Sequence, residues 1–180
     1  MNSTALDRRL VALDFDGCIA LGSNAKIRFA KEKWGVELAV EQTAEDVSPL
    51  GPQRYREMMD AVGRRTGEYE LAPHCRESLE GLLDKGFCLA VVTSRADYEL
   101  DAAKYFIAKH KLPIQATDVH NTQRGGKKSV CQQLGAVAFL EDSLWKLVEL
   151  RGTGVALYFM KQPWNGHEQH KASQLKFIVP

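Results

Sequence analysis

Five short apolar runs divide the chain and predict the strands of one sheet. They are residues 10–13, 87–92, 114–119, 136–140 and 155–160, of which 114–119 is the weakest. Most of these runs are continuous rather than alternating in polarity. Continuous apolar runs are typical of parallel strands that are covered by helices on both faces.

Helical patterns lie between the later runs. Residues 98–110, 128–134 and 143–150 show the spacing of amphipathic helices. In the first of them the apolar face is formed by Leu100, Ala103, Phe106 and Ile107. Strands that alternate with helices in this way predict an α/β fold with a doubly wound, mainly parallel sheet.

The stretch between the first and second predicted strands is far longer than one crossover helix requires. Within it, residues 25–34 and 55–64 have helical patterns, and a proline- and glycine-rich breaker at 48–52 separates them. We therefore expect a small helical cap at residues 20–70, inserted into a core that consists of residues 1–19 and 71–180.

The composition indicates a globular protein without a strong charge preference for a partner. Hydrophobic residues make up 44% of the 180 residues and charged residues 26%, which excludes disordered and collagen-like chains. The net charge of +1 provides no overall field to recruit a nucleic-acid polymer or an anionic membrane surface. No apolar run approaches the roughly 18 to 20 residues that a membrane span needs.

The cysteines point to a reducing compartment. Cys18, Cys75, Cys88 and Cys131 form no Cys-x-x-Cys pair. Buried reduced thiols in a cytoplasmic protein explain this scatter better than a disulfide framework or a zinc site does. We expect a small-molecule partner, with no nucleic-acid polymer and no membrane. The sequence does not indicate an oligomeric state.

Two carboxylates follow the first predicted strand directly. Asp14 and Asp16 lie in the segment Leu13-Asp14-Phe15-Asp16-Gly17, and ligands of open α/β sheets bind at the carboxyl ends of the strands. Two neighbouring carboxylates are unfavourable unless a cation neutralises them or one of them keeps its proton. A hard divalent ion such as Mg²⁺ satisfies the first condition, and an acid/base role satisfies the second. The alternative is a simple turn at Asp16-Gly17.

Three further segments place polar groups at strand ends or helix starts. Thr93 and Ser94 end the second predicted strand and offer hydroxyl and backbone N–H groups to a phosphate oxygen. Lys127 opens a predicted helix, with Lys128 as its competitor for an anion. Glu141-Asp142 ends the fourth predicted strand and could complete a cation site that Asp14 begins. Taken singly, each segment is only weak evidence for a site. Thr93-Ser94 is a common polar pair after a strand, the two lysines are more often a solvated charge pair, and adjacent acids usually form a simple loop.

Together and in this order, these segments resemble the haloacid dehalogenase-like superfamily of phosphohydrolases. The resemblance covers nearly the whole chain and implies a Rossmann-like core with a helical cap in the position called C1. It implies that Asp14 is the nucleophile that forms an aspartyl-phosphate, and that Asp16 is the general acid and base. Thr93, Ser94 and Lys127 would hold the phosphoryl group.

The resemblance also implies a Mg²⁺ cofactor. Its ligands would be Asp14, the backbone carbonyl of Asp16, and Asp142. Glu141 stands where an aspartate is frequent in this superfamily, so direct and water-mediated metal contact by Glu141 both remain open.

A later segment resembles the 5'-nucleotidase-like branch of the superfamily. Pro163-Trp164-Asn165 follows the last predicted strand, and a proline, an aromatic residue and an asparagine occupy this place in that branch. The alternative is a proline-terminated strand with an aromatic side chain that covers the core.

The cap is expected to select the substrate by closing over the cleft. Its candidate specificity residues are Arg28, Trp34, Arg54 and Tyr55, which could stack on a base or bind a second anion. The helical spacing of Tyr55 more often indicates packing against the neighbouring cap helix.

The sequence thus predicts a Mg²⁺-dependent phosphatase that acts on a small phosphomonoester, with a nucleoside monophosphate as one candidate. An aspartate two positions after the nucleophile favours phosphate chemistry over dehalogenation, because a leaving alkoxide needs a proton and a halide does not. Two alternatives remain: a phosphosugar mutase of the same fold, and an interaction module without catalytic activity.

Overall fold

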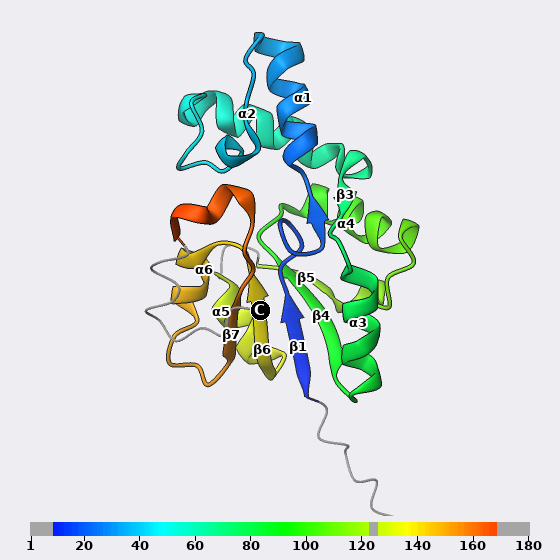
Figure 1. Cartoon of the computed structure of the whole chain (residues 1–180). Coiled ribbons are helices and arrows are strands. Elements are labelled where there is room, and N and C mark those ends of the chain that lie inside the picture. Colours follow the sequence, from blue (N-terminus) through cyan, green and yellow to red (C-terminus); the bar gives the residue numbers. More distant parts are fainter. Residues whose placement is uncertain (1–8, 123–125, 169–180) are drawn as a thin grey trace, which may run out of the picture.

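A computed structural model describes residues 9–122 and 126–168 of the chain. Its centre is a five-stranded sheet with the strand order β5-β4-β1-β6-β7, in which every neighbouring pair is parallel (Figure 1). The strands are β1 (Leu10–Leu13), β4 (Cys88–Thr93), β5 (Val119–Asn121), β6 (Ala136–Glu141) and β7 (Ala156–Phe159). The predicted parallel α/β sheet is confirmed.

Helices cover both faces of this sheet, as the continuous apolar strands require. They are α3 (Cys75–Asp84), α4 (Asp97–Lys109), α5 (Gly126–Gln133) and α6 (Leu144–Glu149). Val11 and Leu13 of β1 pack in one apolar cluster with α3 and α4, whereas Ala12 packs in a second cluster with α5 and α6. Adjacent residues of β1 therefore serve opposite faces of the sheet.

The third predicted strand is displaced in the structure. Residues 116–118 form a 3₁₀ turn, and β5 begins only at Val119, where it pairs with Val91. Ile114 is buried but lies outside the strand. The predicted strand at 114–119 was therefore wrong in position, because the short edge strand follows the register of β4 rather than the apolar residue that precedes it.

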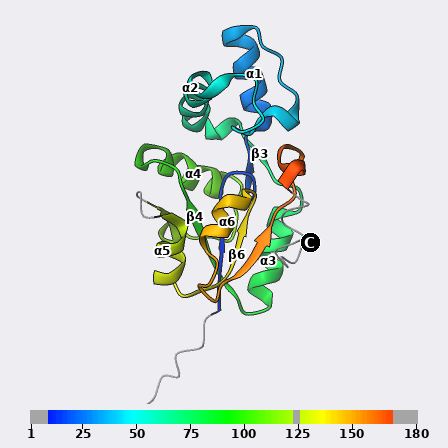
Figure 2. The same cartoon turned by 90° about the vertical axis from the view of Figure 1, so that its left-hand side faces the viewer.

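The insert between β1 and α3 contains two helices, α1 (Ser23–Trp34) and α2 (Gly51–Arg64). Figures 1 and 2 show both helices beyond the carboxyl ends of the sheet strands. Two short strands, β2 (Ala20–Leu21) and β3 (Glu70–Leu71), pair antiparallel at the base of the insert. The remaining 3₁₀ segments are η1 (Val40–Gln42), η2 (Thr66–Glu68) and η4 (Pro163–Glu168).

Helix α2 begins inside the segment that the sequence suggested as a breaker. Gly51 and Pro52 form its first turn rather than a separate loop. Proline is tolerated there because the first N–H groups of a helix have no partner within the helix. In the part of the chain that the structure describes, no helix is long and apolar enough to cross a membrane.

Candidate active site

Polar side chains from three neighbouring strands meet at one end of the sheet. Asp14 directly follows β1, Thr93 is the last residue of β4, and Glu141 is the last residue of β6. The register aligns these strand ends, since Leu13 lies beside both Val91 and Leu140. All three of these residues are buried. The polar groups at the strand ends are therefore shielded from bulk water.

A buried lysine joins two of these acids. The Nζ atom of Lys127, from the first turn of α5, lies 2.7 Å from Oδ1 of Asp14 and 2.5 Å from Oε2 of Glu141. Burial opposes a charge on Lys127, but the two carboxylates outweigh it and raise the lysine pKa above its ordinary value. Lys128 is exposed to solvent. Of the two lysines, only Lys127 therefore lies among the buried acids.

A second lysine approaches the same acids from the other side. Nζ of Lys146, on α6, lies 3.9 Å from Oδ2 of Asp14 and 3.9 Å from Oε1 of Glu141. These distances are too long for hydrogen bonds but are close enough for a strong electrostatic interaction in a partly buried site. The two lysines thus lie beside different oxygens of the same two carboxylates.

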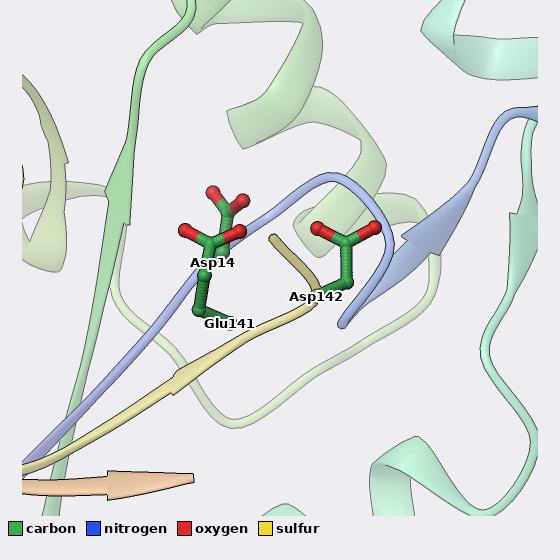
Figure 3. Close-up of side chains that lie close together, drawn as sticks. All are labelled: Asp14, Glu141 and Asp142. Atoms are coloured by element: carbon green, nitrogen blue, oxygen red, sulfur yellow. The ribbon is translucent and has the colours of Figure 1, made fainter. Parts of the chain in front are cut away.

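Three acids form a cluster that could hold a metal ion. Carboxylate oxygens of Asp14, Glu141 and Asp142 lie within 4.8 Å of one another (Figure 3). Burial, followed by the negative charge of Glu141, raises the pKa of Asp14 to about 7. Burial and the charge of Asp14 likewise raise the pKa of Asp142. A bound cation would relieve this unfavourable clustering.

The donor set of the cluster fits Mg²⁺. Among the described residues, hydrogen bonds reach Oδ1 of Asp14, from Phe15 N and Lys127, and Oδ2 of Asp142, from Trp164 Nε1. Both oxygens of Glu141 also accept hydrogen bonds, from Ser143 N and from Lys127 Nζ. One oxygen of each aspartate therefore remains for a cation. All available donors are oxygens, which a hard ion such as Mg²⁺ prefers.

The loop after β1 approaches the cluster so closely that only glycine fits. Gly17 has a positive φ of 82°, and a Cβ atom there would lie 2.1 Å from Oδ2 of Asp142. A larger residue would have to displace the Asp142 carboxylate, because real Cβ atoms do not approach other atoms so closely.

The Pro163-Trp164-Asn165 segment holds the acidic loop in place. Trp164 Nε1 donates to Oδ2 of Asp142 at 2.8 Å, and Asn165 Nδ2 donates to the backbone oxygen of Asp142 at 2.7 Å. The neighbouring Gln162 donates from Nε2 to the backbone oxygen of Gly17 at 2.6 Å. This segment therefore orients Asp142 and anchors the loop that carries Gly17.

Asp16 is paired with an arginine that sequence reasoning did not single out. Nε and Nη2 of Arg95 donate to the two carboxylate oxygens of Asp16, each at 2.8 Å. Burial acts to raise the pKa of Asp16, but the paired guanidinium outweighs it and holds the pKa below its ordinary value. The only sequence signal was the position of Arg95 directly after Thr93-Ser94 at the end of a predicted strand.

Two cavities meet at Asp16. The smaller, of about 230 Å³, is lined by Asp14, Asp16, Thr93 and Ser94 together with residues of α2 in the insert. The larger, of about 390 Å³, extends from Asp16 and Asp142 between the insert and the core. Lys146 lines both cavities. One part of a bound ligand in the smaller cavity would thus contact the carboxyl ends of the strands. The rest of that ligand could extend into the larger cavity.

The cap residues that the sequence suggested separate into two groups. Tyr55 lines the larger cavity, where Lys26 also lies with its Nζ 5.7 Å from the Tyr55 ring centroid. Among the described residues, Arg28, Trp34 and Arg54 line neither cavity. Arg28 pairs with Glu68 at 3.1 Å, and the guanidinium of Arg54 stacks 5.7 Å above the Trp34 ring. These three side chains contact other parts of the insert instead of the cleft.

The sequence matches no protein-family model, and no curated protein matches it. The structure resembles that of a haloacid dehalogenase-like family hydrolase from Streptococcus pneumoniae, with a TM-score of 0.63 at 14% identity over 96% of this chain and 92% of the other. A HAD family hydrolase from Deinococcus radiodurans R1, solved with bound phosphate and sodium, gives a TM-score of 0.66 at 15% identity over 96% and 90% of the two chains.

A Thermotoga maritima protein whose proposed activity is that of a β-phosphoglucomutase gives a TM-score of 0.60 at 19% identity, over 95% of this chain and 93% of the other. At such identities the likeness establishes the fold. The chain has the Rossmann-like α/β fold of the haloacid dehalogenase-type hydrolases, as the sequence motifs predicted.

Proposed function

We propose that this chain is a Mg²⁺-dependent phosphatase that hydrolyses a small phosphomonoester through an aspartyl-phosphate on Asp14. The observation that carries the proposal is that Asp14 lines a cavity together with Thr93 and Ser94. The same carboxylate contacts the buried Lys127 and lies in one acidic cluster with Asp142. A carboxylate is an established nucleophile in phosphoryl transfer. Cationic and hydrogen-bonding groups around it stabilise the oxygens that gain charge.

The reaction would proceed in two steps. An oxygen of Asp14 would attack the phosphorus as the bond to the leaving oxygen breaks. Asp16 would protonate that oxygen and release an alcohol, which requires that one of its two hydrogen bonds from Arg95 opens and that the carboxyl takes up a proton first. The Asp16 carboxylate then takes a proton from water, whose oxygen attacks the phosphorus. The bond between phosphorus and Asp14 breaks, which releases inorganic phosphate and restores both aspartates.

The acidic cluster would hold the Mg²⁺. Asp14, Asp142 and the backbone carbonyl of Asp16 are the proposed ligands, and Glu141 would contribute directly or through water. When bound, Mg²⁺ supplies positive charge that offsets the repulsion between the Asp14 carboxylate and a phosphate dianion. Lys127 would neutralise Asp14 and Glu141 from the opposite side and donate a hydrogen bond to a phosphoryl oxygen.

We further propose that residues 20–70 form a cap of the C1 type that selects the leaving group. The larger cavity lies between this insert and the core, and Tyr55 and Lys26 contribute to it from the insert. Its aromatic lining and the Pro163-Trp164-Asn165 resemblance to the 5'-nucleotidase-like branch support a nucleoside monophosphate as a candidate substrate.

A phosphosugar mutase is the second candidate, and the Thermotoga maritima neighbour is the observation that favours it. A mutase would pass the phosphoryl group from Asp14 to a second sugar hydroxyl instead of to water. Phosphorus NMR of the products separates the two reactions, because a phosphatase accumulates inorganic phosphate and a mutase accumulates an isomeric sugar phosphate.

The test is hydrolysis of a chromogenic aryl phosphate and of a panel of nucleotides, sugar phosphates and phosphorylated cofactors. We expect phosphate release that requires Mg²⁺ and that falls by about 10³-fold or more in Asp14→Asn. Asp84→Asn removes an exposed carboxylate at the end of α3 and serves as the matched control. Folded, Mg²⁺-loaded protein that turns over no phosphoester would contradict the proposal.

A further inference from the structure

A phosphoryl group in the smaller cavity needs a cationic partner. Among the described residues, more acidic than cationic side chains line that cavity, and the cationic ones are Arg95 and Lys146. A phosphate dianion beside carboxylates is unfavourable unless a positive charge contacts it. The group must therefore meet a cationic side chain that still has hydrogen-bond donors free.

Arg95 is held by protein acceptors at all three of its guanidinium nitrogens. Nε and Nη2 donate to the two oxygens of Asp16, each at 2.8 Å. Nη1 donates to Oγ1 of Thr66 at 2.6 Å and to the backbone oxygen of Gly63 at 3.3 Å. The Arg95 side chain is only 5% exposed. Arg95 therefore has little capacity left for a ligand in the cavity.

Lys127 is also largely committed to protein acceptors. Its Nζ lies 2.7 Å from Oδ1 of Asp14 and 2.5 Å from Oε2 of Glu141. With two of its three N–H groups used in this way, at most one remains for a phosphoryl oxygen. The side chain is 2% exposed, and Lys127 does not belong to the described residues that line the two cavities.

Lys146 differs from both, because its ammonium group makes no hydrogen bond to the described residues. The two carboxylate oxygens beside it, Oδ2 of Asp14 and Oε1 of Glu141, each lie 3.9 Å from Nζ. These carboxylates favour the charged form of the lysine. Its side chain is 22% exposed and lines both cavities. Lys146 thus presents a charged donor where the two cavities meet.

We infer that Lys146 binds the phosphoryl group that is transferred to Asp14, and that it is a substrate-binding residue of this site. The inference rests on the proposed function and deepens it. Lys146 keeps its three protons throughout and only donates hydrogen bonds to the phosphoryl oxygens that stay on phosphorus. A phosphorus atom bonded to Asp14 would bring those oxygens within reach of an ammonium 3.9 Å from that carboxylate.

The spacing of Lys146 fits a shared ligand better than a simple ion pair. A direct pair closes to hydrogen-bond distance, as that of Lys127 with Asp14 does. The charge of Lys146 also acts differently on the two ions of the proposed reaction, because it repels a cation at the acidic cluster and attracts an anion beside it. Loss of this charge should therefore change the affinities for Mg²⁺ and for phosphate in opposite directions.

Calorimetric titration with inorganic phosphate tests the contact without turnover. The test variant is Lys146→Met, and Lys161→Met is its matched control at an exposed position. Lys26→Met is a second comparison, because Lys26 lines the larger cavity but not the smaller one. It measures how much affinity is lost when a positive charge is removed near the site without a direct contact. Each protein is titrated at a Mg²⁺ concentration that saturates it.

We expect Lys146→Met to weaken phosphate binding on the order of 10- to 100-fold, which corresponds to the loss of a hydrogen bond to a charged group. Lys26→Met should weaken it by less than about threefold, and Lys161→Met should not change it measurably. Lys146→Arg retains a cationic donor that suits phosphate and should recover most of the affinity. For an alkyl phosphate, kcat/KM should fall in Lys146→Met by at least the same factor as phosphate affinity.

Equal losses of phosphate affinity in Lys146→Met and Lys26→Met would assign the effect to the overall charge of the site and overturn the inference. A structure of the wild type with Mg²⁺ and vanadate provides a measurement that does not depend on the folding of a variant. Nζ of Lys146 should lie within about 3.2 Å of a vanadate oxygen. Vanadate bound at Asp14 with no oxygen within that distance of Lys146 would likewise overturn the inference.

The proposed function and this inference fail in different ways. A wild type that binds no phosphate and hydrolyses no phosphoester removes both. An active wild type whose Lys146→Met variant binds phosphate as tightly as Lys161→Met does removes only the inference.

Discussion

The two lysines at the start of α5 have opposite surroundings. Lys127 is buried between Asp14 and Glu141, whereas its neighbour Lys128 is exposed. Lys127→Met would leave two buried carboxylates with Lys146, at 3.9 Å, as their nearest remaining cation. Removal of one partner of a buried ion pair lowers stability by about 3 to 5 kcal/mol. Lys128→Met should change stability by less than about 0.5 kcal/mol. Urea unfolding of the two variants measures the difference, and equal stabilities would contradict the buried contacts of Lys127.

Lys146 should weaken the binding of a divalent cation. Its ammonium lies 3.9 Å from the Asp14 oxygen that no backbone or lysine hydrogen bond occupies. Positive charges at such a distance repel each other, and the effect at a partly buried site is large enough to shift affinity on the order of tenfold or more. Lys146→Met should therefore bind Mg²⁺ more tightly in a calorimetric titration.

This measurement does not depend on turnover, and exposed Lys161→Met provides its control. An unchanged or weaker Mg²⁺ affinity in Lys146→Met would show that the ion does not bind beside Asp14 and Glu141.

At the residue scale, the sequence indicated the groups that stand at strand ends. Asp14, Thr93 and Glu141 could be predicted to meet because the carboxyl ends of parallel strands share one edge of a sheet. The positions of Lys146 and Lys26 at the site could not be predicted. A lysine on an amphipathic helix is usually solvated, and only the packing of that helix decides whether it faces a cavity. The pairing of Arg95 with Asp16 could not be predicted either. The two residues are remote in sequence, and their contact depends on the conformations of two loops.

At the element scale, the loop between β1 and β2 should tolerate only glycine at position 17. Gly17→Ala adds a Cβ at 2.1 Å from the Asp142 carboxylate and requires a positive φ. We expect a loss of about 1 to 2 kcal/mol in stability from the backbone conformation. The displaced carboxylate should also weaken Mg²⁺ binding measurably.

Gly86→Ala separates the two effects. Gly86 has a nearly identical φ of 80°, but a Cβ there would meet no atom within 4 Å. It should lose stability to a similar extent and keep the Mg²⁺ affinity of the wild type. If Gly17→Ala binds Mg²⁺ as tightly as Gly86→Ala does, Asp142 is not a ligand.

The apolar pattern predicted the sheet strands of four or more residues well, including the edge strand β7, and the shorter strands poorly. Strands β1, β4 and β6 are flanked by neighbours on both sides, and each lies within two residues of its predicted bounds. The edge strand β5 has only three residues and one partner, so its position depends on pairing with β4 rather than on its own composition. The two-residue strands β2 and β3 are too short to show any periodicity.

At the scale of the whole molecule, the insert and the core should move relative to each other when ligand binds. Two chain segments, residues 17–22 and 69–72, connect them beside the larger cavity. Vanadate together with Mg²⁺ mimics a bound phosphoryl group. It should slow amide hydrogen exchange in both segments and in residues 63–66, where Nη1 of Arg95 donates to the backbone oxygen of Gly63 and to Oγ1 of Thr66. Protection confined to the strand ends would contradict a cap that closes on the substrate.

The alternation of strands and helices and the long first connection were sufficient to predict the architecture. The larger cavity could not be predicted in the same way. It is lined by residues of α1, the α1–α2 connection, α2, α6 and η4, and no local pattern indicates that these segments come together. For this reason Arg28, Trp34 and Arg54 were suggested by their chemistry alone, although their side chains contact other parts of the insert.

The most direct test of the account is the identity of the phosphorylated residue. In Asp16→Asn, an activated aryl phosphate should still transfer its phosphoryl group to Asp14, because the leaving group needs no proton, whereas the missing base should stall hydrolysis of the intermediate. Acid quenching with Mg²⁺ present, followed by mass spectrometry of the peptides, should find one phosphoryl group on Asp14 and none in the Asp14→Asn variant. A phosphoryl group on another residue, or no phosphorylated protein under conditions where the wild type turns over, would contradict the account.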